Sequence, residues 1–160
     1  MKVFSIAGWS GSGKTTLITQ LIMHFKRKNK TVIAVKHTPH KYYVEPESVD
    51  TFKFLEAGAD EACLVAKNEM LQMRQITNPT DAISILKTQY PHCDFLLLEG
   101  LLQNDIPLIE VFDPGKNNAL KFPIKTLCAV VSDKPITTAV PNFNPKDINE
   151  ISKFMEEYNG

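Results

Sequence analysis

Short apolar runs alternate along the chain with segments whose apolar residues recur every three or four positions. The apolar runs have the length and composition of strands, and they occupy residues 2–7, 31–37, 93–100, 107–112 and 125–133. The helical pattern occupies a segment that begins at Thr15 and the ranges 49–60, 79–90 and 144–158. Uninterrupted apolar strands are typical of a parallel sheet that is covered on both faces. Strands that alternate with helices therefore predict an α/β sandwich with a mainly parallel sheet.

One part of the chain departs from this alternation. Residues 61–67 and 69–76 are two strand-like runs separated by Asn68, a turn-forming residue, so they predict a β-hairpin. The apolar residues of the second run favour either core or a sheet shared between two chains. The least regular stretch is 38–48, and a loop of that length in a compact domain is often functional. No linker or repeat interrupts the rest, so we expect one domain over residues 1–160.

Composition narrows the classes of function. The chain has 160 residues and a formal net charge of +0, so no strong field attracts it to nucleic acid or to a membrane surface. The start of the sequence lacks the pattern of a signal peptide, and no run of about 18 apolar residues would cross a bilayer. We therefore expect a cytoplasmic protein.

The strongest motif is GWSGSGKTT, residues 8–16, between the first strand and the first helix. Gly8, Gly13, Lys14 and Thr15 have the spacing of a phosphate-binding loop. Glycines allow successive backbone N–H groups to face an anion, and the following helix contributes the positive end of its dipole. Lys14 would reach the β- and γ-phosphates, and the Thr15 hydroxyl would bind Mg²⁺. The predicted phosphate contacts within the motif are Gly8, Gly11, Ser12, Gly13, Lys14, Thr15 and Thr16.

Two further segments follow strands whose carboxyl ends should meet this loop. In CDFLLLEG, Glu99 lies at the carboxyl end of the strand and Asp94 at the opposite end, so Glu99 is the predicted second metal contact, through water. Asp94 is expected to be a solvated strand start. In VKHTPH, Lys36, His37 and Thr38 would emerge beside the loop and contact phosphate. The alternative for His37 is hydrogen-bonded packing.

With these pieces in place the chain resembles the MobB family of molybdopterin-guanine dinucleotide biosynthesis adaptor proteins. The resemblance rests on GWSGSGKTTL, VIAVKHTPH, FLEAGAD, FLLLEG and AVVSDKP, in this order. It implies a GTP-binding protein with a P-loop NTPase-like three-layer fold, Mg²⁺ and at most a weak GTPase activity. It also implies a homodimer with a shared sheet, and a partner guanylyltransferase that joins GMP to molybdopterin. Whether molybdopterin itself binds is left open.

The resemblance adds two acidic residues to the predicted site. Asp50 matches an acidic position near the metal, although valine replaces the lysine that usually precedes it. Asp133, in SDKP, stands where a guanine-reading carboxylate would be expected, because a carboxylate accepts hydrogen bonds from guanine N1–H and N2–H. The alternative for Asp133 is a capped turn before Pro135.

Two other functions use the same loop. A free-standing metabolite kinase using ATP would need cations to stabilise the transferred phosphoryl group, and the chain has only two arginines, Arg27 and Arg74. A switch GTPase would need a glutamine to orient water, and the nearest is Gln103. Trp9, inside the loop, either packs over its outer surface or contacts a partner.

Overall fold

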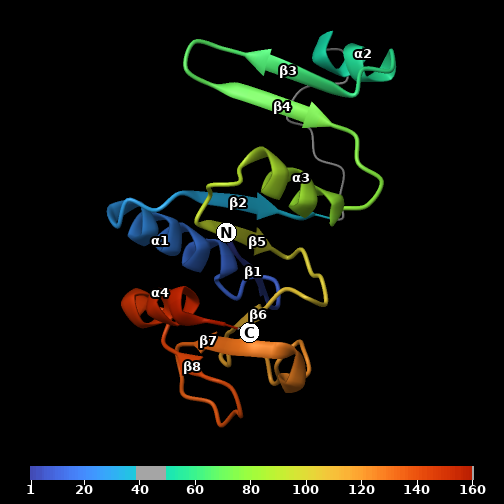
Figure 1. Cartoon of the computed structure of the whole chain (residues 1–160). Coiled ribbons are helices and arrows are strands. Elements are labelled where there is room, and N and C mark those ends of the chain that lie inside the picture. Colours follow the sequence, from blue (N-terminus) through green and yellow to red (C-terminus); the bar gives the residue numbers. More distant parts are fainter. Residues whose placement is uncertain (39–49, 160) are drawn as a thin grey trace. The chain divides into compact units, whose positions relative to one another are not determined.

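The computed structural model describes residues 1–38 and 50–159. These form two compact units (Figure 1): unit 1 comprises Met1–His37 and Ile83–Gly160, and unit 2 comprises Thr38–Ala82. The prediction of one domain over the whole chain stays a prediction.

Unit 1 is built on a six-stranded sheet in the order β2-β5-β1-β6-β7-β8, and every neighbouring pair is parallel. Its strands are β1 (Lys2–Ala7), β2 (Val32–Lys36), β5 (Phe95–Glu99), β6 (Leu108–Phe112), β7 (Leu127–Ser132) and β8 (Asn142–Phe143). β1 lies at the centre of the sheet, with Lys2 opposite Phe95 of β5 and Ser5 opposite Leu108 of β6. The predicted parallel α/β fold is confirmed.

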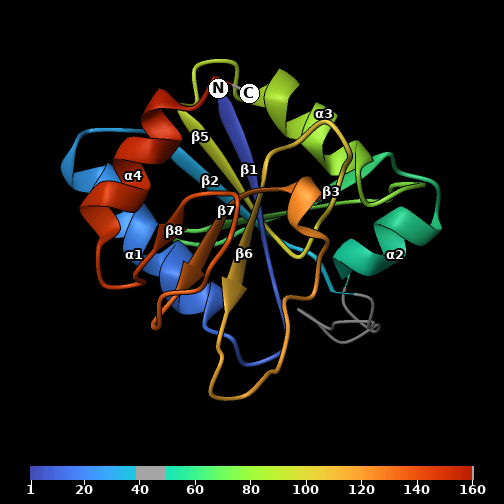
Figure 2. The ribbon, with the colours of Figure 1, turned by 90° about the horizontal axis from the view of Figure 1, so that it is seen from below.

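Helices cover both faces of this sheet, which explains its continuous apolar strands. α1 (Lys14–Arg27) and α4 (Ile148–Glu157) lie on one face, and α3 (Asp81–Gln89) lies on the other (Figure 2). In β5, Leu97 packs with Phe25 and Ile151 on the first face, whereas Leu96 and Leu98 pack on the second. Because alternate residues of one strand are buried on opposite sides, none of them needs to be polar. The result is the expected three-layer sandwich.

Unit 2 contains α2 (Asp50–Glu56) and the antiparallel pair β3 (Glu61–Val65) and β4 (Met70–Arg74). The hairpin turn is closed by the Ala66 N–H, which donates to the Glu69 carbonyl at 2.9 Å, so the predicted hairpin about Asn68 is confirmed. Gly58 follows α2 with a φ of 100°, as expected of a helix-ending glycine. Most of the irregular stretch 38–48 lies outside the described residues.

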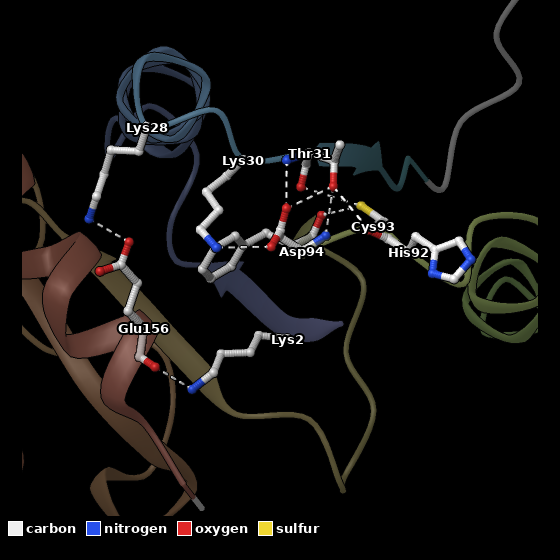
Figure 3. A network of polar contacts seen from close by, with 9 residues as sticks. Lys2, Lys28, Lys30, Thr31, His92, Cys93, Asp94 and Glu156 are labelled. Carbon is white, nitrogen blue, oxygen red and sulfur yellow. Dashed lines mark hydrogen bonds and ion pairs between the residues drawn. The ribbon is translucent and has the colours of Figure 1, made fainter.

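Asp94 differs from its prediction as a solvated strand start. Its carboxylate accepts hydrogen bonds from the Thr31 N–H at 2.8 Å, the Thr31 hydroxyl at 2.9 Å and Lys30 Nζ at 3.1 Å (Figure 3). These bonds, the Thr31 N–H foremost, lower the pKa of Asp94 to about 2. Asp94 thus joins the start of β5 to the start of β2. In the same view, the Glu156 carboxylate of α4 pairs with Lys28, which follows α1.

Two elements have no counterpart in the prediction, namely β8 and the 3₁₀ turn η1 (Ile124–Thr126). β8 has two residues and is held by side-chain bonds: Asn142 Nδ2 donates to the Val130 carbonyl at 3.3 Å, and Asn142 Oδ1 accepts from the Ile136 N–H at 3.2 Å. A strand of two residues is too short to show the alternating pattern by which strands are predicted from a sequence. Among the described residues, no helix combines the length and apolar character needed to cross a bilayer.

Candidate functional site

The loop between β1 and α1 adopts a backbone that requires glycine at specific positions. At Gly8, where φ is +146°, a Cβ atom would lie 2.2 Å from the Val111 carbonyl oxygen of β6. Gly13 precedes α1 with a φ of 97°, a left-handed conformation, and no side chain caps the helix there. The first turn of α1 also contains no acidic residue. No side chain of the first turn therefore neutralises the positive end of the helix dipole, which is available to an anion bound at the loop.

A polar atom inside this loop supports its interpretation as an anion cradle. Ser12 Oγ is buried and has no hydrogen-bond partner among the described residues. A buried hydroxyl without a partner costs free energy, which a ligand oxygen would offset. Together with the glycine backbone, this hydroxyl fits a phosphate group.

Lys14 curls over the loop. Its Nζ atom donates to the Trp9 carbonyl at 2.7 Å and to the Gly8 carbonyl at 3.3 Å. Partial burial lowers the pKa of Lys14, the nearby Glu99 carboxylate opposes this, and the positive charges of Lys121 and Lys36 lower it further. Several lysines therefore share this small region, and Glu99 is the carboxylate of the described residues that offsets them at Lys14.

Thr15 and Glu99 form the polar pair that the order of the strands predicts. The Thr15 hydroxyl lies 3.0 Å from each carboxylate oxygen of Glu99, and Lys36 Nζ lies 3.5 Å from Oε1. The Glu99 side chain is only 13% exposed. A hydroxyl and a carboxylate are oxygen ligands suited to Mg²⁺, with water and phosphate oxygens completing its shell. In the described part of the chain, no three His, Cys, Asp or Glu side chains form a metal-binding cluster of their own.

The remaining predicted contacts are placed as follows. The His37 N–H donates to the Glu99 carbonyl at 2.9 Å, so the end of β2 is fixed beside the end of β5. Thr38 and Asp50 belong to unit 2, where Asp50 pairs with Lys53 at 3.2 Å. Their contacts with phosphate and metal stay predictions.

Asp133 is exposed just beyond the carboxyl end of β7. The turn after this strand uses Ser132 instead, whose Oγ accepts the Lys134 N–H at 3.4 Å. Asp133 is therefore not the residue that makes this capping bond. Base recognition by Asp133 stays a prediction.

One neighbouring segment was missed by the sequence reasoning. The segment 113–122, here called the β6 loop, follows β6 and contacts the phosphate-binding loop at three points. Lys116 Nζ donates to the Gly11 carbonyl at 3.0 Å, Trp9 Nε1 donates to the Ala119 carbonyl at 3.0 Å, and Lys121 Nζ lies 5.6 Å from the centroid of the Trp9 ring. Trp9 itself is 39% exposed. The sequence does contain one signal for this segment, because its lysines follow the carboxyl end of β6, a strand next to β1.

The chain is similar to known proteins over most of its length. The family model described as "MobB: Molybdopterin guanine dinucleotide synthesis protein B" matches residues 3–133. A protein of Haemophilus influenzae named "Molybdopterin-guanine dinucleotide biosynthesis adapter protein" is 27% identical, over 98% of this chain and 88% of that protein. A protein of the same name from Escherichia coli is 24% identical, over 98% of this chain and 92% of its own length.

Solved structures share the fold. The crystal structure of Bacillus subtilis MobB superposes with a TM-score of 0.70 at 21% identity and covers 100% of this chain and 99% of its own. The MobB homolog from Bacillus stearothermophilus gives a TM-score of 0.65 at 20% identity, covering 98% and 96%. At these identities the likeness establishes the fold and no more.

Proposed function

Since the chain belongs to the MobB family, we propose that it is a cytoplasmic adaptor that binds GTP and Mg²⁺ and serves molybdopterin guanine dinucleotide synthesis. Its partner would be the guanylyltransferase that attaches GMP to molybdopterin. The proposal draws on the names of the relatives for the pathway, and on the chemistry of the site for the nucleotide.

Three neighbouring features support the proposal that the chain binds a nucleotide. They are the glycine-built loop, Lys14 above this loop, and the Thr15–Glu99 pair beside it. Phosphate oxygens would take hydrogen bonds from the loop N–H groups and from Ser12 Oγ. Lys14 would exchange the Gly8 and Trp9 carbonyls for phosphate oxygens, which are stronger acceptors because they are charged. When bound, Mg²⁺ would neutralise phosphate charge, and Thr15 and Glu99 would hold it directly or through water.

Holding nucleotide fits the site better than transferring phosphate. Arg27 ends α1, and Arg74 is in β4 of unit 2, where it pairs with Glu61 at 2.8 Å. Arg27 is the only arginine in the sequence of unit 1, and it lies at the end of α1 opposite to the loop, whereas phosphoryl-transfer enzymes commonly rely on an arginine beside the transferred group. The kinase that uses ATP is therefore the second choice.

The hairpin of unit 2 supports the proposed homodimer. Val65 is 73% exposed, Met70 is 62% exposed and Phe54 of α2 is 54% exposed. A two-stranded sheet with apolar residues in water is marginal alone and is stabilised when a second chain adds strands. We propose that two copies pair through this hairpin. Sedimentation at about twice the chain mass of 18.0 kDa is the expected result, and a monomer at every concentration would contradict it.

The first experiment uses Trp9, the only tryptophan. Its fluorescence is followed while GTP or ATP is added, with and without Mg²⁺. We expect saturation by Mg²⁺-GTP at lower concentration than by ATP. No response in fluorescence or calorimetry to either nucleotide would contradict the proposed function, whereas a preference for ATP would favour the kinase.

A further inference from the structure

The β6 loop holds its last residues in a fixed position through a buried carboxylate. Glu110, in the middle of β6, has a fully buried side chain. Its two oxygens accept the backbone N–H groups of Lys121 at 2.6 Å and Phe122 at 3.1 Å. Burial raises the pKa of Glu110, and these two bonds, followed by the positive charge of Lys121, oppose that rise. The main chain at Lys121 is thus attached to the centre of the sheet.

The side chain of Lys121 extends from this anchor to the phosphate-binding loop. Its ammonium group lies 5.6 Å from the Trp9 ring centroid and 5.7 Å from that of Phe122, while the residue as a whole is exposed. Trp9 in turn is bonded to the β6 loop through the Ala119 carbonyl. The Lys121 ammonium group therefore lies over the indole ring of Trp9, which is itself a residue of the phosphate-binding loop.

Among the described residues Lys121 forms no ion pair, although its charge acts on the buried Glu110 carboxylate and opposes the rise in the pKa of that group. By contrast, Lys116 in the same loop pairs with Asp113 at 3.1 Å. Lys121 also acts on Lys14, since its charge helps to lower the pKa of Lys14. Bringing two like charges towards one loop is unfavourable unless an anion lies between them.

We propose that Lys121 is a second lysine that binds the phosphate groups of the nucleotide, together with Lys14. This inference rests on the proposed function, because it assigns a residue to that same site. Lys14 belongs to the glycine motif itself, whereas Lys121 is supplied by the β6 loop, which follows a strand paired with β1. The two ammonium groups would contact the phosphate chain from different elements, and Trp9 would keep the stem of Lys121 extended.

A packing role for Lys121 makes a different prediction from a charge role. If the side chain only covers Trp9, Lys121→Met should behave like the wild type, because methionine keeps an apolar stem on the ring. If the charge binds phosphate, Lys121→Met should bind weakly and Lys121→Arg should bind nearly as well as the wild type. The matched control is Lys125→Ala, an exposed lysine in η1 that precedes β7, at the opposite end of the sheet.

The test measures binding of Mg²⁺-GTP and of inorganic tripolyphosphate by calorimetry, since changes near Trp9 alter its fluorescence. Loss of one charged contact should weaken binding by about tenfold or more. We expect this loss for Lys121→Ala and Lys121→Met with both ligands, and no change for Lys125→Ala. Wild-type protein that binds neither ligand would contradict the proposed function and this inference with it. Wild-type binding that Lys121→Met leaves unchanged, or that it weakens for GTP but not for tripolyphosphate, would overturn this inference alone.

Discussion

The hydroxyl of Thr15 lies 3.0 Å from both carboxylate oxygens of Glu99, although the two residues are 84 positions apart in the chain. Thr15 is at the start of α1 and Glu99 at the end of β5, and the parallel pairing of β1 with β5 brings them together. This pair is where a divalent cation would meet the phosphate-binding loop.

Glu99→Gln should remove most of the gain in GTP affinity that Mg²⁺ provides. The amide keeps the size of the side chain and loses the charge, so we expect the ratio of affinities with and without Mg²⁺ to fall about tenfold. Calorimetric titration in Mg²⁺ and in EDTA measures this ratio. The matched control is Asp94→Asn at the opposite end of the same strand, which should leave the ratio unchanged. An unaltered ratio in Glu99→Gln would remove this residue from the metal site.

Lys14→Ala should weaken binding of GTP by about a hundredfold, because the removed ammonium would contact charged phosphate oxygens. Its present acceptors are two loop carbonyls, so the fold should persist, and thermal unfolding checks this. Lys26→Ala, an exposed lysine near the other end of α1, is the control. Tight binding of GTP by a folded Lys14→Ala protein would contradict the interpretation of residues 8–16 as a phosphate-binding loop.

If Asp133 reads guanine, Asp133→Ala should reduce the preference for GTP over ATP by about tenfold, mainly through weaker GTP binding. The alternative capping role is already filled by Ser132, so the variant should unfold at nearly the wild-type temperature. Competition between the two nucleotides measures the preference. The same preference in the variant would assign base recognition to another residue.

Asp94→Asn should destabilise the protein above about pH 4 and have little effect near pH 2. The pKa of Asp94 is lowered to about 2 in the folded protein, whereas an unfolded aspartate has a pKa of about 3.9. The folded state therefore favours the charged form, and this contribution is lost as the pH falls from about 4 towards 2. Urea midpoints measured across this range should converge for variant and wild type. Asp105→Asn, at an exposed loop position, serves as the control, and parallel midpoints in Asp94→Asn would contradict the role of Thr31 and Lys30.

Much of unit 1 could be predicted because its elements are encoded locally. The uninterrupted leucines of β5 could be assigned to a parallel strand, since both faces of such a strand are buried. The glycine loop and Glu99 could be placed at one edge, because the carboxyl ends of parallel strands meet there. The hairpin of unit 2 could be predicted from a turn residue between two runs of strand-forming side chains.

The features that were missed depend on partners distant in sequence. Asp94 looks like an ordinary strand start until Thr31 lies beside it. Nothing local distinguishes Glu110 from a solvated glutamate, because its partners are backbone N–H groups of a loop that begins after the strand ends. Lys121 has no periodicity or motif around it, and its relation to the site appears only in the folded structure, through its position over Trp9 and the effect of its charge on Lys14.

The central position of β1 has a consequence for the order in which the newly made chain can acquire structure. β1 is synthesised first, yet its neighbours β5 and β6 begin at residues 95 and 108. Pairing over such separations is slow, and it cannot start before those strands have left the ribosome. The hairpin of unit 2 pairs Glu61 with Arg74, a short separation, and needs no distant strand. We therefore expect the two strands of the hairpin to pair transiently during translation, before β1 can pair with either of its neighbours, and to become stable only when a second chain adds strands.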